Sequence, residues 1–318
     1  MITRVHPTLS REELLRKALF SGNQFNETEF PPPRLLMEPW LCEASYNLIY
    51  APAGVGKTFF SIAVAHTVAT GRKMLNWRAV NSAGVLYVDG EVGCTEMQSR
   101  ILRISGGVIP SNFHVISTPQ MVVEGGSVMN LAYKDWRDTF MVVLRSLPDI
   151  KLIVVDNISS LFSGLKMNDE ESWSEPNQFF IGLRALGYCI LLIHHSGKEL
   201  SGGPRGTSLL EGSVNMLIQL SRIGGIDNSD GCHLNVRWEK SRSVIGEAIR
   251  DRKIYLVDDL IKPYFADFMP MTDERQKIYD YLSTHPDAVH EPVRALVDKI
   301  GVSKSLISVV IKGVREDE

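Results

Sequence analysis

Residues Ala51 to Thr58 read Ala-Pro-Ala-Gly-Val-Gly-Lys-Thr and follow the apolar run Tyr46–Tyr50. The apolar stretch Phe59–Val68 comes next, so we expect a strand, a glycine-bearing loop and a helix. Such a loop wraps backbone N–H groups around phosphates, because glycine permits close approach and the helix directs its positive end at the anion. Ala51 stands where glycine is usual, which is the mildest change. The residues expected to bind the nucleotide are Ala53, Gly54, Val55, Gly56, Lys57, Thr58 and Phe59.

Two side chains of this loop are expected to do chemistry. Lys57 would contact the β- and γ-phosphates, and Thr58 would offer its hydroxyl to a metal ion. The expected cofactors are therefore ATP and Mg²⁺.

Hydrolysis of ATP also needs an acid that holds Mg²⁺ through its water shell. The apolar run Leu152–Val155 ends in Asp156, as expected for a buried strand that delivers a carboxylate to the phosphate loop. Asp156 could alternatively cap the turn that begins at Asn157.

A second carboxylate must orient or activate the attacking water. The strand that begins at Gly84 ends in two acids, Asp89 and Glu91, separated by Gly90. We favour Glu91, which lies past the strand end. Asp89 could take this role instead, or only cap the turn.

A third apolar run, Leu191–Ile193, ends in His194 and His195. A histidine here can donate a hydrogen bond to the γ-phosphate and report its loss. A metal shared by the pair is not expected, since adjacent residues of a strand point to opposite faces.

The last group that ATP hydrolysis needs is a positive charge supplied by a neighbouring subunit. Such a charge can raise the rate about 10³- to 10⁵-fold. Arg205 lies in a glycine-rich loop and is suited to reach outward, while Lys240 and Arg242 end a later strand. Solvated surface charges are the ordinary alternative for all three, and spacing alone does not choose among them.

The composition divides the chain into three parts, of which the third is residues 271–318. Residues 1–33 are polar, with one expected helix at Ser10–Phe20 that opens on a capping box, and then a proline-rich linker. Residues 34–268 alternate short strands with helices, which predicts an α/β fold with a twisted, mainly parallel sheet covered by helices on both faces. The later runs His233–Glu239 and Lys253–Val257 alternate and predict antiparallel strands at the sheet edge.

Composition narrows the cellular setting. The net charge of −3 gives no global attraction to nucleic acid, so any such contact must be local. The four cysteines are far apart, which argues against a zinc site and a disulfide scaffold. No signal peptide and no apolar run of about 18 residues is recognised, so we expect a cytoplasmic protein without membrane contact.

Residues 271–318 form the third part, a small helical domain. Helices are expected at Asp273–Ser283, Glu291–Ile300 and Lys304 to about Lys312, with a tight turn at Gly301. This is a helix-turn-helix pattern, and it would present Ser303, Lys304 and Ser305 to DNA. A three-helix module that contacts protein is the alternative.

With these residues assembled, the chain resembles the RecA-type ATPases, and more narrowly the RepA-like hexameric replicative helicases of plasmids and mobile elements. The resemblance covers about residues 34–260. It is carried by the phosphate loop and by the segments Leu-Tyr-Val-Asp-Gly-Glu (86–91), Leu-Ile-Val-Val-Asp-Asn (152–157), Ile-His-His-Ser-Gly-Lys (193–198) and Pro-Arg-Gly-Thr-Ser-Leu-Leu-Glu-Gly-Ser-Val-Asn (204–215).

The resemblance implies a ring of identical subunits, a hexamer, with ATP between neighbours. It implies Glu91 as the catalytic carboxylate, Asp156 as the Mg²⁺-associated acid, and His194 or His195 as the sensor. Arg205 would reach the neighbour's site, with Lys240 as a possible second charge.

Single-stranded DNA would pass through the centre of this ring. The loops at about 159–171 and 197–206 match the channel-facing positions of the wider RecA group, where Lys166 and Lys198 could meet phosphates. The acidic residues Asp169, Glu170 and Glu171 oppose that assignment.

The C-terminal helix-turn-helix is a departure from the plasmid helicases and resembles winged-helix modules. It could contact duplex DNA or replication proteins. The favoured function is thus an ATP-driven motor on single-stranded DNA. The alternatives are an ATP-switched regulator or loader and a RecA-like recombinase.

Overall fold

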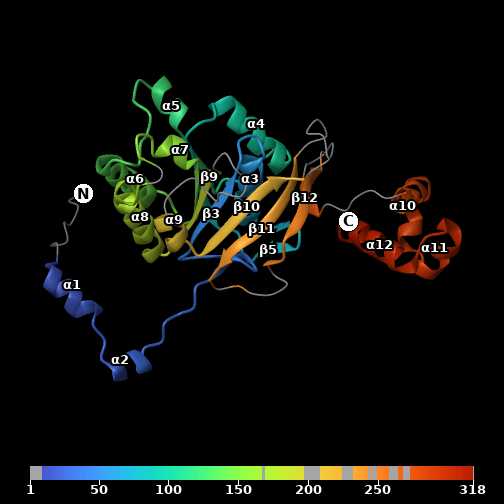
Figure 1. Cartoon of the computed structure of the whole chain (residues 1–318), viewed down its shortest axis with the longest axis horizontal. Helices are drawn as coiled ribbons and strands as arrows, with labels where there is room; N and C mark the ends of the chain where they lie inside the picture. Colours follow the sequence, from blue (N-terminus) through green and yellow to red (C-terminus); the bar gives the residue numbers. More distant parts are fainter. Residues whose placement is uncertain are drawn as a thin grey trace.

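A central β-sheet organises the computed structural model of the chain (Figure 1). The structure describes residues 9–166, 169–196, 208–223, 232–242, 244, 249–257, 264–267 and 273–317. Within them the main sheet has nine strands. In spatial order these are β13 (Tyr264–Asp267), β12 (Arg252–Val257), β11 (His233–Ser241), β10 (Met216–Arg222), β3 (Tyr46–Ala51), β9 (Cys189–His195), β8 (Ile150–Asp156), β6 (Gly84–Asp89) and β7 (Phe113–Ser117).

The centre of the sheet is parallel, as expected from its apolar runs. Strands β10, β3, β9, β8, β6 and β7 pair in parallel, and β11, β12 and β13 extend the sheet antiparallel. Burial on both faces explains why β3, β6 and β8 are apolar along nearly their whole length. The predicted α/β class with a mainly parallel sheet is therefore confirmed.

Helices cover the two faces of the sheet through separate apolar clusters. On one face α3 (Lys57–Thr70) and α4 (Cys94–Ser105) pack, together with a small sheet of β1 (Leu35–Glu38), β2 (Leu41–Cys42), β4 (Lys73–Met74) and β5 (Trp77–Ala79). The opposite cluster includes residues of α6 (Lys134–Ser146), α7 (Ile158–Leu161), α8 (Glu170–Ala185) and α9 (Ser208–Ser213). The short α5 (Thr118–Val123) follows β7.

The N-terminal part forms two short helices rather than the one expected. The first, α1 (Arg11–Ala18), begins at the predicted capping box, in which Ser10 accepts from the Glu13 N–H and the Glu13 carboxylate accepts from the Ser10 N–H. A second capping box, at Ser21, starts α2 (Gly22–Glu27). Neither helix has a buried residue, and Figure 1 shows both on a stretch of chain that leads away from the sheet.

The C-terminal part has its own apolar core. The helices are α10 (Asp273–Thr284), the 3₁₀ turn η4 (Pro286–His290), α11 (Val293–Ile300) and α12 (Lys304–Asp317). All buried members of the third apolar cluster lie between Ile278 and Ile311. The helix expected from Glu291 begins later, because Pro292 takes an extended backbone and delays the start of α11 to Val293. The turn at Gly301 is as expected, with a left-handed backbone (φ 72°).

No helix among the described residues combines the length and apolar character needed to cross a bilayer.

A substitution in this third core tests whether the C-terminal helices fold as a unit of their own. Leu296 is fully buried there, so Leu296→Ala should cost that unit about 2–5 kcal/mol of stability. Hydrogen exchange should show faster exchange confined to 273–317, and nucleotide affinity should stay unchanged. Ser305→Ala, at an exposed position, is the control. Loss of protection across the main sheet would contradict separate cores.

Candidate nucleotide-binding site

The phosphate loop lies where the sequence predicts it, between β3 and α3. Gly54 (φ 71°) and Gly56 (φ 112°) have left-handed backbones that other residues rarely adopt. A Cβ on Gly56 would also collide with the Cys232 Sγ. The loop conformation therefore requires glycine at the second of these positions for two independent reasons.

Carbonyl groups of this loop are hydrogen-bonded, whereas several of its N–H groups are not within the part of the chain that the structure describes. Carbonyl groups of the loop have partners, and those of Gly54 and Val55 accept from Arg222 and Cys232. Within the described residues, no hydrogen bond is donated by the N–H groups of Ala53, Gly54, Val55 or Gly56. A run of unpaired N–H groups before a helix is the donor set that a phosphate chain needs, so the residues fit the nucleotide.

Lys57 folds back over its own loop. It is 6% exposed, and its Nζ donates to the carbonyl oxygens of Ala51 (3.0 Å) and Pro52 (2.9 Å). Burial lowers the pKa of Lys57, against the opposing effect of the Asp156 and Glu91 carboxylates. Because the ammonium has only weak neutral acceptors here, a phosphate is a stronger partner for it.

His195 contacts the same ammonium. Its Nδ1 lies 3.2 Å from the Lys57 Nζ. An ammonium only donates, so Nδ1 must accept, which places the imidazole proton on Nε2. His194 is fully buried and lies on the opposite side of the strand, as expected from the alternation of side chains. Of the two predicted sensors, His195 is the one that the structure brings to the phosphate loop.

Asp156 lies beside the loop at the end of β8. It is almost fully buried, and burial raises the pKa of its carboxyl, while hydrogen bonds from the Tyr87 and Thr58 hydroxyls oppose that rise. The Tyr87 hydroxyl donates to Oδ2 at 2.7 Å, and the Ser61 hydroxyl lies 2.8 Å from the Tyr87 oxygen. A hydroxyl and a carboxylate next to a phosphate site suit Mg²⁺, which commonly takes few protein ligands. Thr58 and Asp156 would hold that ion.

Asp89 and Glu91 have different environments although only one residue separates them. Asp89 is 1% exposed, and its Oδ1 accepts the N–H groups of Glu91 (3.2 Å) and Val92 (3.0 Å). Burial raises the pKa of Asp89 to about 6, despite these two hydrogen bonds. The exposed Glu91 carboxylate accepts from the Asn157 side chain. Asp89 thus caps the turn, and Glu91 is the carboxylate left accessible to a reactant.

Of the predicted trans-acting charges, Lys240 and Arg242 lie away from this loop. Arg205 and Lys198 lie outside the described residues. Lys240 pairs with Leu217 across β10 and β11, about 17 Å along the strand from Arg222 at the phosphate-loop end. Lys240 and Arg242 instead donate to the carbonyl groups of Glu211 and Gly212, at the end of α9. Their expected nucleotide contact cannot be to the loop of their own chain.

The segment after β8, which holds the predicted DNA contact Lys166, is braced from outside. The side chain of Asn130 donates to the Ser163 carbonyl and hydroxyl oxygens (2.9 and 2.8 Å), and the Leu131 N–H donates to the Leu161 carbonyl (2.7 Å). Lys166 itself is exposed.

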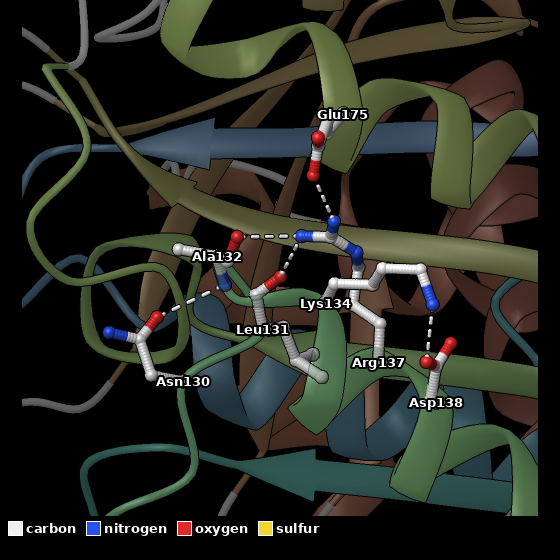
Figure 2. Close-up of polar contacts among 7 residues, drawn as sticks. All are labelled: Asn130, Leu131, Ala132, Lys134, Arg137, Asp138 and Glu175. Atoms are coloured by element: carbon white, nitrogen blue, oxygen red, sulfur yellow. Dashed lines mark hydrogen bonds and ion pairs between the residues drawn. The ribbon is translucent and has the colours of Figure 1, made fainter.

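Arg137 fixes this brace in place. Figure 2 shows the buried Arg137 donating to the carbonyl groups of Leu131 (3.1 Å) and Ala132 (2.6 Å) and pairing with Glu175 of α8. One guanidinium thus holds the bracing segment against α8.

Four residues of the site escaped the sequence reasoning: Ser61, Tyr87, Arg222 and Cys232. Tyr87 lies two residues before Asp89 on the same face of β6, so the alternation of the strand could have indicated it. Arg222 ends β10, a strand that was not predicted, and no pattern near it points to the phosphate loop.

The fold and the site together define a P-loop ATPase of RecA-like architecture. Residues 10–201 match the family model described as AAA domain, so the chain belongs to that family. No curated protein matches the sequence.

Solved structures support the same fold. A KaiC-like protein from the archaeon Pyrococcus horikoshii OT3 is 14% identical, with a TM-score of 0.51 over 75% of this chain and 100% of that one. The RadB recombinase is also 14% identical, with a TM-score of 0.50 over 72% of this chain and 93% of that one. At this identity they show the architecture alone.

The raised pKa of Asp89 predicts how stability depends on pH. The folded chain holds the Asp89 proton up to about pH 6, whereas the unfolded chain releases it near its ordinary pKa of 3.8. The Asp89 contribution should therefore lower the free energy of unfolding as pH rises from about 4 to about 6, and the loss should persist above 6. Asp89→Asn keeps an oxygen for the turn and removes this dependence. Relative to wild type, it should gain about 1–3 kcal/mol between pH 4 and 7.

Urea unfolding at several pH values measures this difference, and Asp138→Asn, at an exposed site on α6, is the control. A difference between wild type and Asp89→Asn that stays constant over this pH range would contradict the assignment.

Proposed function

We propose that the protein is an ATP-driven motor that acts on single-stranded DNA in the replication of a plasmid, phage or other mobile element. One observation carries the ATPase part of this proposal: the ends of four adjacent parallel strands bring Lys57, Asp156, Glu91 and His195 around one row of unpaired N–H groups. The motor part rests on the likeness of residues 193–198 and 204–215 to the RepA-like helicases.

The motor is proposed to be a ring of identical subunits, with six as the expected number. Lys240 and Arg242 support this, because they lie at the end of β11 away from their own phosphate loop and could serve a nucleotide only in another copy. Arg205 is proposed as the main charge in that role. ATP would then be bound between two subunits, and Mg²⁺ would be held by Thr58 and Asp156.

DNA is proposed to follow the ring's centre. The exposed Lys166 follows Leu161 and Ser163, the residues to which Leu131 and Asn130 donate hydrogen bonds after the end of β8. Lys198 is the second proposed contact. The neighbouring acids Asp169, Glu170 and Glu171 reduce the net attraction for phosphates.

A second function is an ATP-switched regulator or loader. The separate apolar core of 278–311 favours it, because Ser303, Lys304 and Ser305 are exposed at the start of α12. The start of the second helix is where helix-turn-helix proteins contact base edges.

Glu91→Gln tests the catalytic assignment. The amide keeps the size and the contact with Asn157 but cannot accept a proton, so turnover should fall about 10²- to 10⁴-fold. Retained affinity for a fluorescent ribose-labelled ATP, measured by titration, should accompany that loss. Lys57→Ala should abolish both binding and turnover.

Glu96→Gln, at an exposed position on the adjacent helix, is the matched control and should behave as wild type. Full turnover in Glu91→Gln together with loss in Asp89→Asn would reverse the roles of the two acids.

Single-stranded DNA should stimulate hydrolysis if the protein is a motor. We expect the rate to rise with a single-stranded oligonucleotide and to rise less in Lys166→Ala, because a phosphate contact is lost. Electron microscopy with ATP and DNA should show closed rings. Equal rates with and without DNA, or open filaments, would contradict the motor.

A duplex-specific footprint would favour the regulator instead. That footprint should disappear when Ser303, Lys304 and Ser305 are all changed to alanine.

A further inference from the structure

The hairpin of β10 and β11 approaches the phosphate loop from the neighbouring side of β3. Strand β10 pairs in parallel with β3, and β11 returns antiparallel, with Arg222 opposite Leu234. The end of this hairpin therefore reaches the same edge of the sheet as the loop. The backbone at Arg222 is held there, because the Asn235 side chain donates to the Arg222 carbonyl at 2.9 Å.

Two side chains of the hairpin contact two successive carbonyl groups of the loop. The Arg222 Nη2 donates to the Gly54 carbonyl oxygen at 3.0 Å, and the Cys232 Sγ lies 3.6 Å from the Val55 carbonyl oxygen. Burial raises the pKa of the Cys232 thiol to about 11, against the effect of Arg222. The thiol keeps its proton near neutral pH and can donate it.

Each of these contacts to a carbonyl group also fixes the direction of the N–H group in the same peptide. In a trans peptide the carbonyl oxygen and the following N–H point in opposite directions. A Gly54 carbonyl turned outward to Arg222 therefore turns the Val55 N–H inward, and a Val55 carbonyl turned to Cys232 does the same for the Gly56 N–H. Within the described residues, neither of these two N–H groups donates a hydrogen bond.

We propose that Arg222 and Cys232 are positioning residues, which preset the orientation of the Val55 and Gly56 N–H groups for a nucleoside triphosphate. This inference rests on the proposed nucleotide site and adds to it a hairpin distant in the sequence. Arg222 contributes more, because its bond of 3.0 Å is charge-assisted, whereas a thiol is a weak donor.

The proposal separates affinity from chemistry. A loop that is not preset must order itself when the nucleotide binds, so affinity falls, while Glu91 and Asp156 on other strands keep their geometry. Arg222→Ala should raise the dissociation constant for a fluorescent ribose-labelled ATP, and the KM for ATP, about tenfold. It should leave kcat within about twofold, since the bound loop is the same.

Three further variants sharpen this test. Arg222→Lys keeps a charged donor and should recover part of the affinity. Cys232→Ala should weaken binding by about two- to fivefold. Arg237→Ala, at an exposed position on the same hairpin, is the control and should bind as wild type. The double variant of Arg222 and Cys232 should fall short of the product of the two single effects, because both act on one loop.

The outcomes distinguish this inference from the function on which it rests. Failure of the wild-type chain to bind the labelled ATP would remove the proposed nucleotide site. Binding by wild type with an unchanged dissociation constant in Arg222→Ala would overturn the positioning role alone. A fall in kcat equal to the rise in KM would also overturn it, because Arg222 would then act on the chemistry.

Discussion

A loop that binds phosphate must turn several backbone N–H groups inward, and its carbonyl groups then need hydrogen-bond donors of their own. Here the donors to these carbonyl groups come from different parts of the chain. Lys57 bonds the carbonyl groups of Ala51 and Pro52, and the hairpin of β10 and β11 bonds those of Gly54 and Val55. The Gly56 carbonyl accepts the Phe60 N–H of α3. The carbonyl groups are thus satisfied, while within the described residues the N–H groups of Ala53 to Gly56 donate no hydrogen bond and are left for a phosphate.

The order of the strands in the sheet brings the other residues of the site to this loop. Strands β9, β8 and β6 follow β3 in the sheet, and each ends in a polar residue at the edge where the loop turns. Parallel pairing puts Ala51 opposite His195 and Asp89 opposite Asp156, so these groups meet without a long side chain having to reach. Tyr87 then bonds Asp156 and Ser61, which ties β6, β8 and α3 together beneath the site.

The sequence predicted the parts of this site that are local. A polar residue that ends an apolar run is visible in the chain, and Lys57, Asp156, Glu91 and His195 all lie beside such a run. Arg222 and Cys232 lack that signal, because their partners Gly54 and Val55 are 168 and 177 residues away. The strand β10 was missed although Met216, Leu217, Ile218 and Leu220 form a mostly apolar, buried run. The second N-terminal helix, which begins at the capping box of Ser21, was missed because it is only six residues long.

The cationic side chains near the hairpin fall into two groups, those that contact the phosphate loop of their own chain and those that lie far from it. Lys57 and Arg222 both contact the phosphate loop of their own chain, but neither lies on an element free to withdraw, since one begins α3 and the other ends β10. Lys240 and Arg242 are fixed at the far end of the hairpin by the carbonyl groups of α9, a favourable place for positive charge at a helix C-terminus. The hairpin therefore carries a cation at each end. If copies assemble so that the far end of one hairpin meets the loop of the next chain, strand β11 would connect the two nucleotide sites.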